Sequence, residues 1–194
     1  MLHFIGVYDY TVILTYLSLI SAVMGMIFAG EQNFSAAIWC LVISGVCDGF
    51  DGTVARSKKN RTEDEKGFGI QLDSLCDVIS FGVFPAFVCY QMGVQGVIGL
   101  ICVFGYCVCA VIRLAFFNVQ EAKRQQVESG SNKFYRGLPV TTISIIFPLL
   151  YWFRGLMPAG VFTVVLYMML AVTGFLFILD FKVKKLDVKK LFLR

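Results

Sequence analysis

The sequence predicts an all-α integral membrane protein, with about six transmembrane helices and an active-site cavity near the cytoplasmic side. Of the 194 residues, 58% are hydrophobic and 15% are charged, whereas soluble domains have about 45–50% apolar and about 25% charged residues. This composition excludes most soluble folds, and it excludes disorder, which needs low hydrophobicity. The apolar residues also run continuously, whereas in the strands of a membrane barrel they would alternate with polar residues. The chain 1–194 is expected to form a single membrane domain.

Six continuous apolar stretches define the expected helices, each close to the roughly 20 residues that cross a bilayer. They span approximately 8–29, 35–56, 70–91, 97–119, 137–154 and 161–180. The charged link after the second stretch contains Thr62 and Glu65 at the spacing of a capping box, which predicts that a helix begins there. The link after the fourth stretch, 120–133, is polar, with a flexible part at 129–132.

Lysine and arginine residues predict the orientation in the membrane. Fifteen of the 17 lie in the two polar links and in the C-terminal tail, which an even number of spans places on one side. The positive-inside rule makes that side, with both termini, cytoplasmic. Arg113 lies inside a span and Arg154 on the opposite side, where Tyr90, Tyr151 and Trp152 are expected to form an aromatic belt.

The same basic residues indicate the lipid bilayer, with its anionic headgroups, as a partner. No motif indicates binding of nucleic acid. The first residues lack a basic segment followed by a small-residue cleavage site, so no removable signal peptide is expected. The cell membrane of a prokaryote is the expected location.

Histidine and cysteine contribute little to the predicted chemistry. His3 is the sole histidine, which excludes a histidine-based metal site or a Ser-His-Asp triad. The seven cysteines lie in apolar stretches without a CxxC pair, and they are expected to be small buried apolar residues. Gly45 and Gly49 form a GxxxG pattern, which favours close helix packing within or between chains.

Four acidic residues interrupt the second and third apolar stretches, and they are Asp48, Asp51, Asp73 and Asp77. Each costs roughly 2.5–3.5 kcal/mol near the centre of a membrane helix, so a polar cavity and a cation partner are expected. Spacings of three and four residues place each pair on one helix face. Because a short link joins the two helices, the four carboxylates are expected to converge. Such oxygen ligands suit Mg²⁺, Mn²⁺ or Ca²⁺.

Neighbouring residues favour a phosphate-bearing substrate at this cluster. Gly52 and Arg56 follow Asp48 at intervals of four on the same helical stripe, and Gly69 precedes Asp73 by four. The glycines leave room for a ligand near the backbone, and the forked guanidinium of Arg56 matches a phosphate. Sites with aspartates, metal and phosphate usually catalyse phosphoryl transfer.

The motif residues resemble the signature of the CDP-alcohol phosphotransferase family. The run 48–56, DGFDGTVAR, and the run 69–77, GIQLDSLCD, match all eight fixed positions of D-x-x-D-G-x-x-A-R followed by G-x-x-x-D-x-x-x-D. The segments 60–66, 68–77, 81–86, 113–118 and 134–139 are similar to membrane-embedded phosphatidylserine synthases of bacteria and archaea. The implied reaction transfers the phosphatidyl group of CDP-diacylglycerol to L-serine and releases CMP.

The resemblance also implies roles for individual residues. The metal ligands, for two Mg²⁺ or Mn²⁺ ions, would be Asp48, Asp51, Asp73 and Asp77, and Asp77 would also be the general base. The residues that bind CDP-diacylglycerol would be Gly52, Ala55, Arg56 and Gly69, with Thr15 and Ser18 near the nucleotide. The family often has Thr-x-x-Asn where this chain has Thr15 and Ser18. Homodimers are common in the family, so a homodimer is expected.

Recognition of serine needs a cation for its carboxylate. Arg113 is the first candidate because charged residues inside spans are usually functional, and Arg136 and Asn118 follow. An acceptor such as glycerol 3-phosphate or inositol phosphate is the alternative, and it would want more basic residues in the pocket. A divalent-cation transporter would also use four carboxylates, but it would not explain Ala55, Arg56 or the fixed glycines.

Overall fold

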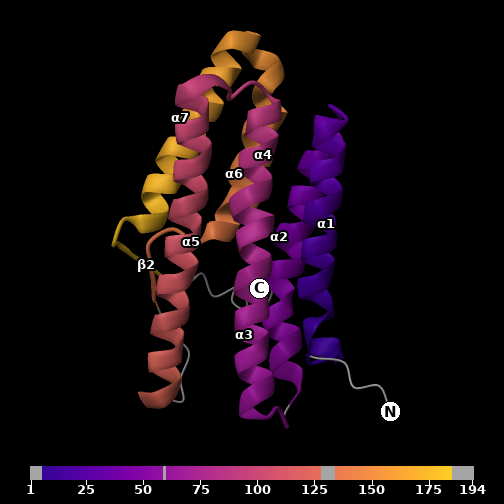
Figure 1. Cartoon of the computed structure of the whole chain (residues 1–194), viewed down its shortest axis with the longest axis vertical. Helices are drawn as coiled ribbons and strands as arrows, with labels where there is room; N and C mark the ends of the chain where they lie inside the picture. Colours follow the sequence, from indigo (N-terminus) through magenta and orange to yellow (C-terminus); the bar gives the residue numbers. More distant parts are fainter. Residues whose placement is uncertain (1–5, 59, 128–133, 185–194) are drawn as a thin grey trace, which may run out of the picture.

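The computed structural model describes residues 6–58, 60–127 and 134–184, and it is almost wholly helical. Long helices run side by side along the molecule (Figure 1). The α-helices are α1 (Ile13–Gly30), α2 (Phe34–Ser57), α3 (Glu63–Asp77), α4 (Phe84–Gln91), α5 (Gly96–Val127), α6 (Ile143–Trp152) and α7 (Ala159–Ile178). The shorter elements are the 3₁₀ turns η1 (Tyr10–Val12), η3 (Val140–Thr142) and η4 (Phe153–Leu156), the π-helix η2 (Val78–Val83), and the strands β1 (Phe134–Arg136) and β2 (Lys182–Lys184).

Five helical segments of the described chain are long and apolar enough to cross a membrane, which confirms the predicted class. They are Tyr10–Gly30, Phe34–Ser57, Glu63–Gln91, Gly96–Gln120 and Gly160–Ile178. The stretch expected at 137–154 is the shorter apolar segment Val140–Leu156. Pro148 lies inside α6, and the 3₁₀ turns η3 and η4 flank this helix.

Two details of the expected pattern are corrected. The fourth helix, expected to end at 119, continues as α5 to Val127. Strands β1 and β2 form a small antiparallel pair with Tyr135 opposite Val183, although no strand was expected. Three-residue strands are too short to show the alternation that identifies a strand in a sequence. The tail beyond residue 184 and the segment 128–133 lie outside the described residues.

Small side chains bring α1, α2 and α4 into close contact. Ser44 Oγ donates to the carbonyl of Ser18 over 2.9 Å, and Ser18 Oγ donates to the carbonyl of Ser44 over 3.3 Å. A Cβ atom at Gly25 would lie 2.1 Å from the ring of Phe84, which is wholly buried. The absence of a side chain at Gly25 therefore makes room for a core aromatic residue.

The π-helix η2 joins α3 to α4 within one candidate span. Pro85 stands in the first turn of α4, and without an N–H group it cannot donate to the preceding turn. The carbonyl of Phe81 instead accepts a hydrogen bond of 2.7 Å from the buried Tyr106 hydroxyl of α5. A second helix thus stabilises the irregular turn that directly follows Asp77.

The two ends of the bundle differ in the connections that they contain (Figure 1). We call the end where α2 leads into α3 the acidic end, and the end with the α1–α2 turn, the α4–α5 turn and η4 the far end. The expected capping box begins α3: Glu65 N donates to Thr62 Oγ1 over 3.1 Å, and Thr62 N donates to Glu65 Oε2 over 3.0 Å.

An ion-pair network closes the acidic end. Lys58 Nζ lies 2.8 Å from Asp9 Oδ2 and 2.9 Å from Glu65 Oε1, so it joins the start of the first span to the α2–α3 connection. The hydrogen bond from Lys58, aided by one from Thr11, lowers the pKa of Asp9 from 3.8 to about 2. The same pairing raises the pKa of Lys58.

Candidate active site

Three of the four predicted acidic residues form a tight cluster inside the bundle. Asp48 of α2 and Asp73 and Asp77 of α3 each offer a carboxylate oxygen, and these oxygens lie within 4.8 Å of one another. Asp77 is buried and the other two are half-buried. Deprotonated carboxylates this close and this shielded from water repel one another strongly, so the cluster favours a bound cation.

The fourth acidic residue, Asp51, lies in the same cavity but outside the group of three. It is buried, and the Thr15 hydroxyl donates to its Oδ2 over 3.4 Å. Its carboxyl group is within hydrogen-bonding reach of Asp73. The structure therefore confirms that the four acidic residues converge, and it separates Asp51 slightly from the other three.

The cluster fits a divalent cation by the chemistry of its ligand atoms. Carboxylate oxygens on two helices are the ligands that Mg²⁺, Mn²⁺ and Ca²⁺ prefer, and no soft sulfur or imidazole ligand belongs to the group of three. Mg²⁺ usually binds through a few carboxylates and completes its shell with water and substrate phosphate. Three carboxylates, with Asp51 beside them, supply such a partial shell.

The carboxylates line a cavity of about 210 Å³ between α2, α3, α5 and η3. Its other walls include Ser74 of α3, Arg113 and Phe117 of α5, and Thr141 of η3. Seven of its eleven lining residues are polar or charged, although the cavity lies among membrane-crossing helices. Its volume is below the roughly 300–1,000 Å³ of a typical small-molecule pocket, so it accommodates part of a substrate.

Arg113 is the cation that faces this acidic cavity among its lining residues. Its side chain is 7% exposed, its Nε donates to the carbonyl of Leu138 over 3.2 Å, and its guanidinium lies 5.7 Å from the centre of the Phe117 ring. Gly137, with φ of 71°, turns the backbone that carries this carbonyl, and a Cβ atom there would lie 3.5 Å from Arg113 Nε. The surrounding backbone therefore holds the predicted acceptor-binding arginine in place.

The two other predicted serine-binding residues are placed less directly. Asn118 accepts a hydrogen bond of 2.8 Å at Oδ1 from Ser74 Oγ, and Ser74 lines the cavity. Asn118 therefore does not line the cavity itself, but it contacts a residue that does. Arg136 belongs to β1, and its side chain lies outside the described part of the chain.

The predicted nucleotide-binding residues follow the α2 and α3 helices toward the acidic end. A Cβ atom at Gly52 would lie 3.3 Å from Arg56 Nη1, and Arg56 Nη2 donates to Thr53 Oγ1 over 3.4 Å. Arg56 is exposed and Ala55 half-buried. The arginine therefore lies over the glycine of its own motif, one helical turn away.

Arg61 is a cation near the motif to which the sequence assigned no role. A Cβ atom at Gly69 would lie 2.7 Å from Arg61 Nη2, and this same nitrogen donates to the carbonyl of Glu65 over 3.0 Å. Its Nε is buried without a hydrogen-bond partner. The guanidinium group of Arg61 thus occupies the space beside Gly69, where other residues would have a side chain. Sequence spacing did not show this, because Arg61 precedes α3, where helical spacing does not apply.

Thr15 and Ser18 have different surroundings in α1. Thr15 contacts Asp51, as described above, whereas Ser18 is buried and bonds the carbonyl of Ser44 and, over 3.5 Å, the hydroxyl of Ser80. Neither belongs to the cavity lining. Their predicted contacts with the nucleotide remain predictions.

The two glycines of the GxxxG pattern, Gly45 and Gly49, have different surroundings. A Cβ atom at Gly45 would lie 2.1 Å from Ser144 Oγ of α6, whereas one at Gly49 would meet no described atom within 4 Å. Close packing within the chain is therefore confirmed for Gly45 alone.

Comparison with known proteins identifies the family. The model of the CDP-alcohol phosphatidyltransferase family matches residues 10–189, and the chain belongs to this family. It is similar to a CDP-diacylglycerol–serine O-phosphatidyltransferase of Saccharomyces cerevisiae, with 34% identity over 69% of this chain and 50% of the relative. A Helicobacter pylori protein of the same name is 38% identical over 53% of this chain and 42% of its own length.

An archaeal relative extends the comparison. The archaetidylserine synthase of Methanothermobacter thermautotrophicus is 31% identical over 69% of this chain and 53% of the relative. The chain thus spans about half the length of the curated relatives it matches. No match was found among solved structures.

Proposed function

We propose that this protein transfers the phosphatidyl group of CDP-diacylglycerol to the hydroxyl group of L-serine and releases CMP. The observation that carries the proposal is the cavity in which Asp48, Asp73 and Asp77 face Arg113. The family assignment supports phosphatidyl transfer to an alcohol, and the names of the relatives support serine as that alcohol.

A diphosphate substrate fits the acidic end through both metal and arginine. We propose that Asp48, Asp51, Asp73 and Asp77 hold two Mg²⁺ or Mn²⁺ ions, which when bound neutralise the diphosphate and polarise the reacting phosphoryl group. Gly52, Ala55 and Gly69 line the α2 and α3 faces beside the cluster, with Thr15 and Ser18 on α1, as the binding region for CDP-diacylglycerol. Arg56, exposed beyond them, binds phosphate as a forked donor.

The proposed chemical step is a displacement at the phosphorus atom that carries diacylglycerol. The serine oxygen bonds to this phosphorus, the bond from phosphorus to the bridging oxygen breaks, and CMP leaves with that oxygen. Asp77 takes the hydroxyl proton as general base, which requires contact with the hydroxyl group. Asp77 is the most buried acid of the group of three and lies where α3 meets η2, so surrounding groups fix its position.

Arg113 would bind the serine carboxylate, and Arg136 and Asn118 would assist. A carboxylate needs one cation, and the described lining of the cavity contains one, Arg113. An acceptor with a phosphate group, such as glycerol 3-phosphate or inositol phosphate, carries more charge. The single cation therefore favours serine over these acceptors.

The test of this proposal is a panel of acceptors with purified protein, CDP-diacylglycerol, and Mg²⁺ or Mn²⁺. Radiolabelled serine should enter the chloroform-soluble lipid, while labelled glycerol 3-phosphate and inositol phosphate should not. Incorporation of glycerol 3-phosphate without serine would contradict the proposed acceptor and retain the reaction class. No incorporation of any alcohol, together with metal uptake into vesicles, would instead support a cation transporter.

We also propose that the acidic end faces the cytoplasm, with both termini, in a prokaryotic cell membrane. Arg56, Lys58, Arg61 and Lys66 gather at the α2–α3 connection, in accord with the positive-inside rule. Labelling of a cysteine introduced at Asn60 by a membrane-impermeant reagent should occur in inverted vesicles and not in intact cells.

We also propose that two copies of the chain form a homodimer. The contact would lie at Gly49, where no described atom of the same chain is within 4 Å of a Cβ position. Light scattering in detergent should give twice the mass of one chain, and a Gly49→Leu variant should give the mass of one.

A further inference from the structure

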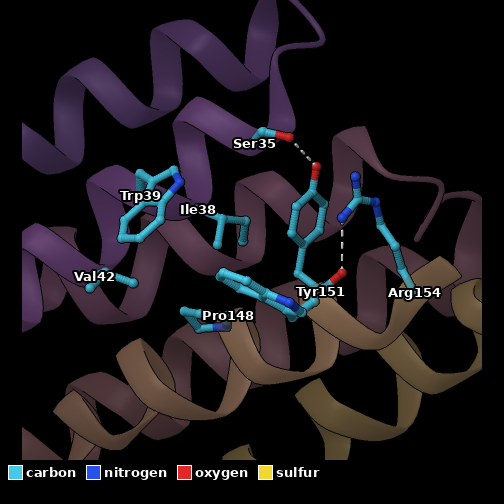
Figure 2. Close-up of a pocket in the computed structure, with 8 residues that line it drawn as sticks. Ser35, Ile38, Trp39, Val42, Pro148, Tyr151 and Arg154 are labelled. Carbon is cyan, nitrogen blue, oxygen red and sulfur yellow. Dashed lines mark hydrogen bonds between the residues drawn. The ribbon is translucent and has the colours of Figure 1, made fainter.

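A groove opens on the lipid-facing side of the far end, between α2 and α6 (Figure 2). It has a volume of about 250 Å³. The two helices approach closely where Gly45 meets Ser144, and they are joined again near the far end, where the Ser35 and Tyr151 hydroxyls lie 2.9 Å apart. The groove lies along this interface, and it touches none of the residues that line the acidic cavity.

The groove changes from polar to apolar along its length. Its polar lining residues, Ser35, Tyr151 and Arg154, lie toward the far end, with Trp39 and Trp152 beside them, and its part nearer the middle of the bundle is lined by Val42 and Pro148. Figure 2 shows Val42 and Pro148 away from the Ser35–Tyr151 pair, on facing helices. From Ser35 to Val42 the groove follows α2 for about 10 Å at 1.5 Å per residue. This order of groups matches the headgroup and the first part of an acyl chain.

Arg154 presents a positioned positive charge at the far-end part of the groove. Its Nη1 donates to the carbonyl of Tyr151 over 3.1 Å, and its guanidinium lies 3.8 Å from the centre of the Tyr151 ring. Tyr151 is itself buried, 8% exposed, so it supports the arginine instead of belonging to the expected aromatic belt. The ion pairs found among the described residues are all at the acidic end and none includes Arg154.

We propose that this groove binds an anionic phospholipid of the leaflet opposite the acidic cavity, with its phosphate on Arg154 and an acyl chain along Val42 and Pro148. The groove belongs to helices in the membrane, where lipid is the surrounding solvent. Guanidinium groups bind phosphate oxygens through paired N–H donors, and a basic residue near a membrane surface attracts anionic headgroups.

The site is separate from the proposed catalytic cavity. Ser35 and Asp48 are thirteen residues apart in α2, about 20 Å along the helix axis. The lipid bound here is therefore not the reacting substrate, and its role is to fill and stabilise the α2–α6 interface. The proposal does not depend on the proposed function, because its test measures binding without turnover.

The chain contains its own reporter for this groove. Its two tryptophans, Trp39 and Trp152, both line it, and both are exposed, 56% and 73%. Their fluorescence is quenched by bromine atoms on a lipid chain in contact with them. The full chain is reconstituted in phosphatidylcholine vesicles with increasing fractions of brominated phosphatidylglycerol or of brominated phosphatidylcholine.

The proposal predicts that half of the maximal quenching needs an about fivefold smaller fraction of brominated phosphatidylglycerol than of brominated phosphatidylcholine. Arg154→Gln should remove this difference, and Lys66→Gln, a matched loss of charge at the acidic end, should retain it. Val42→Phe, which fills the part of the groove nearer the middle of the bundle, should weaken quenching by both lipids.

Equal quenching by the two lipids in the wild-type chain would overturn the proposal, because the tryptophans would then contact only bulk lipid. An absence of quenching by either lipid would overturn it as well, and would show that a second copy of the chain covers the groove. An Arg154→Gln variant that still prefers phosphatidylglycerol would exclude Arg154 as the phosphate ligand.

Discussion

The acidic cavity and the far-end groove are both lined by α2, yet they use an arginine in different ways. In the cavity, Arg113 is buried beside carboxylates and bonded to the Leu138 carbonyl. In the groove, Arg154 is exposed and rests on an aromatic ring. A buried charge in a membrane protein needs partners and is usually functional, whereas a charge at the membrane boundary can remain hydrated. This difference predicts catalytic loss at one arginine and only altered lipid binding at the other.

The largest effect is expected from Asp77→Asn, which removes the proposed base and retains the shape of the side chain. Turnover should fall by at least the roughly 10²–10⁴-fold that a general base contributes, while binding of CDP-diacylglycerol is largely retained. Initial rates with labelled serine and a separate binding assay check this. Asp64→Asn, an exposed change in the first turn of α3, is the matched control. Loss of lipid-nucleotide binding in Asp77→Asn would indicate that Asp77 is mainly a metal ligand.

The next effect compares the two arginines directly. Arg113→Ala should raise the KM for serine by about 10- to 100-fold, as expected for a lost hydrogen bond to a charged group, and should change the KM for CDP-diacylglycerol much less. Arg154→Ala should leave both values unchanged. Arg113→Lys retains the charge and should restore part of the affinity, which separates charge recognition from structural damage. Equal changes in both KM values for Arg113→Ala would contradict the proposed carboxylate contact.

A smaller effect, on stability, is expected at the glycine that joins α2 to α6. Gly45→Ala places a Cβ atom 2.1 Å from Ser144 Oγ, so it should cost about 1–3 kcal/mol through overpacking. Gly49→Ala meets no described atom of its own chain within 4 Å, so its effect within one chain should be neutral or slightly stabilising, because alanine favours a helix by up to about 1 kcal/mol over glycine. Thermal unfolding in detergent compares them, and equal melting temperatures would show that α2 and α6 are not packed closely at Gly45.

The smallest effect should come from the ion pair at the acidic end. The pKa of Asp9 is about 2 in the folded protein against an ordinary value of 3.8, so the pair contributes fully above about pH 4. This contribution disappears as the pH falls through about 2. Melting temperatures of the wild type and Asp9→Asn should therefore differ by a constant amount above pH 4 and converge toward pH 2. A difference that grows on acidification would contradict the pairing with Lys58.

Much of the fold and the acidic cluster could be predicted because both follow from local spacing. Continuous apolar stretches predicted the apolar segments to within a few residues, except that the third segment begins at Glu63 and α5 continues to Val127. Intervals of three and four residues placed Asp48, Asp73 and Asp77 on facing surfaces. The capping box at Thr62 is local as well, since its partners are three residues apart.

Features that depend on tertiary contacts could not be predicted in this way. The π-helix after Asp77 needs the Tyr106 hydroxyl from another helix. The Arg61 side chain lies over Gly69 from outside the helix, where the spacing of helical residues gives no guide. Tyr151 looked like a membrane-boundary residue but is buried against Ser35. In each case the contact that determines the local structure is not one that the spacing of residues within a helix predicts.

The central claim is that the carboxylate cluster supports metal-dependent transfer from CDP-diacylglycerol to serine. The most direct measurement follows CMP release and lipid-linked serine in one reaction, started by adding Mn²⁺ to protein freed of metal by a chelator. The account predicts that both products appear in equal amounts, only after the metal is added, and that Asp73→Asn forms neither. Equal product formation without metal, or release of CMP with no serine in the lipid, would contradict it.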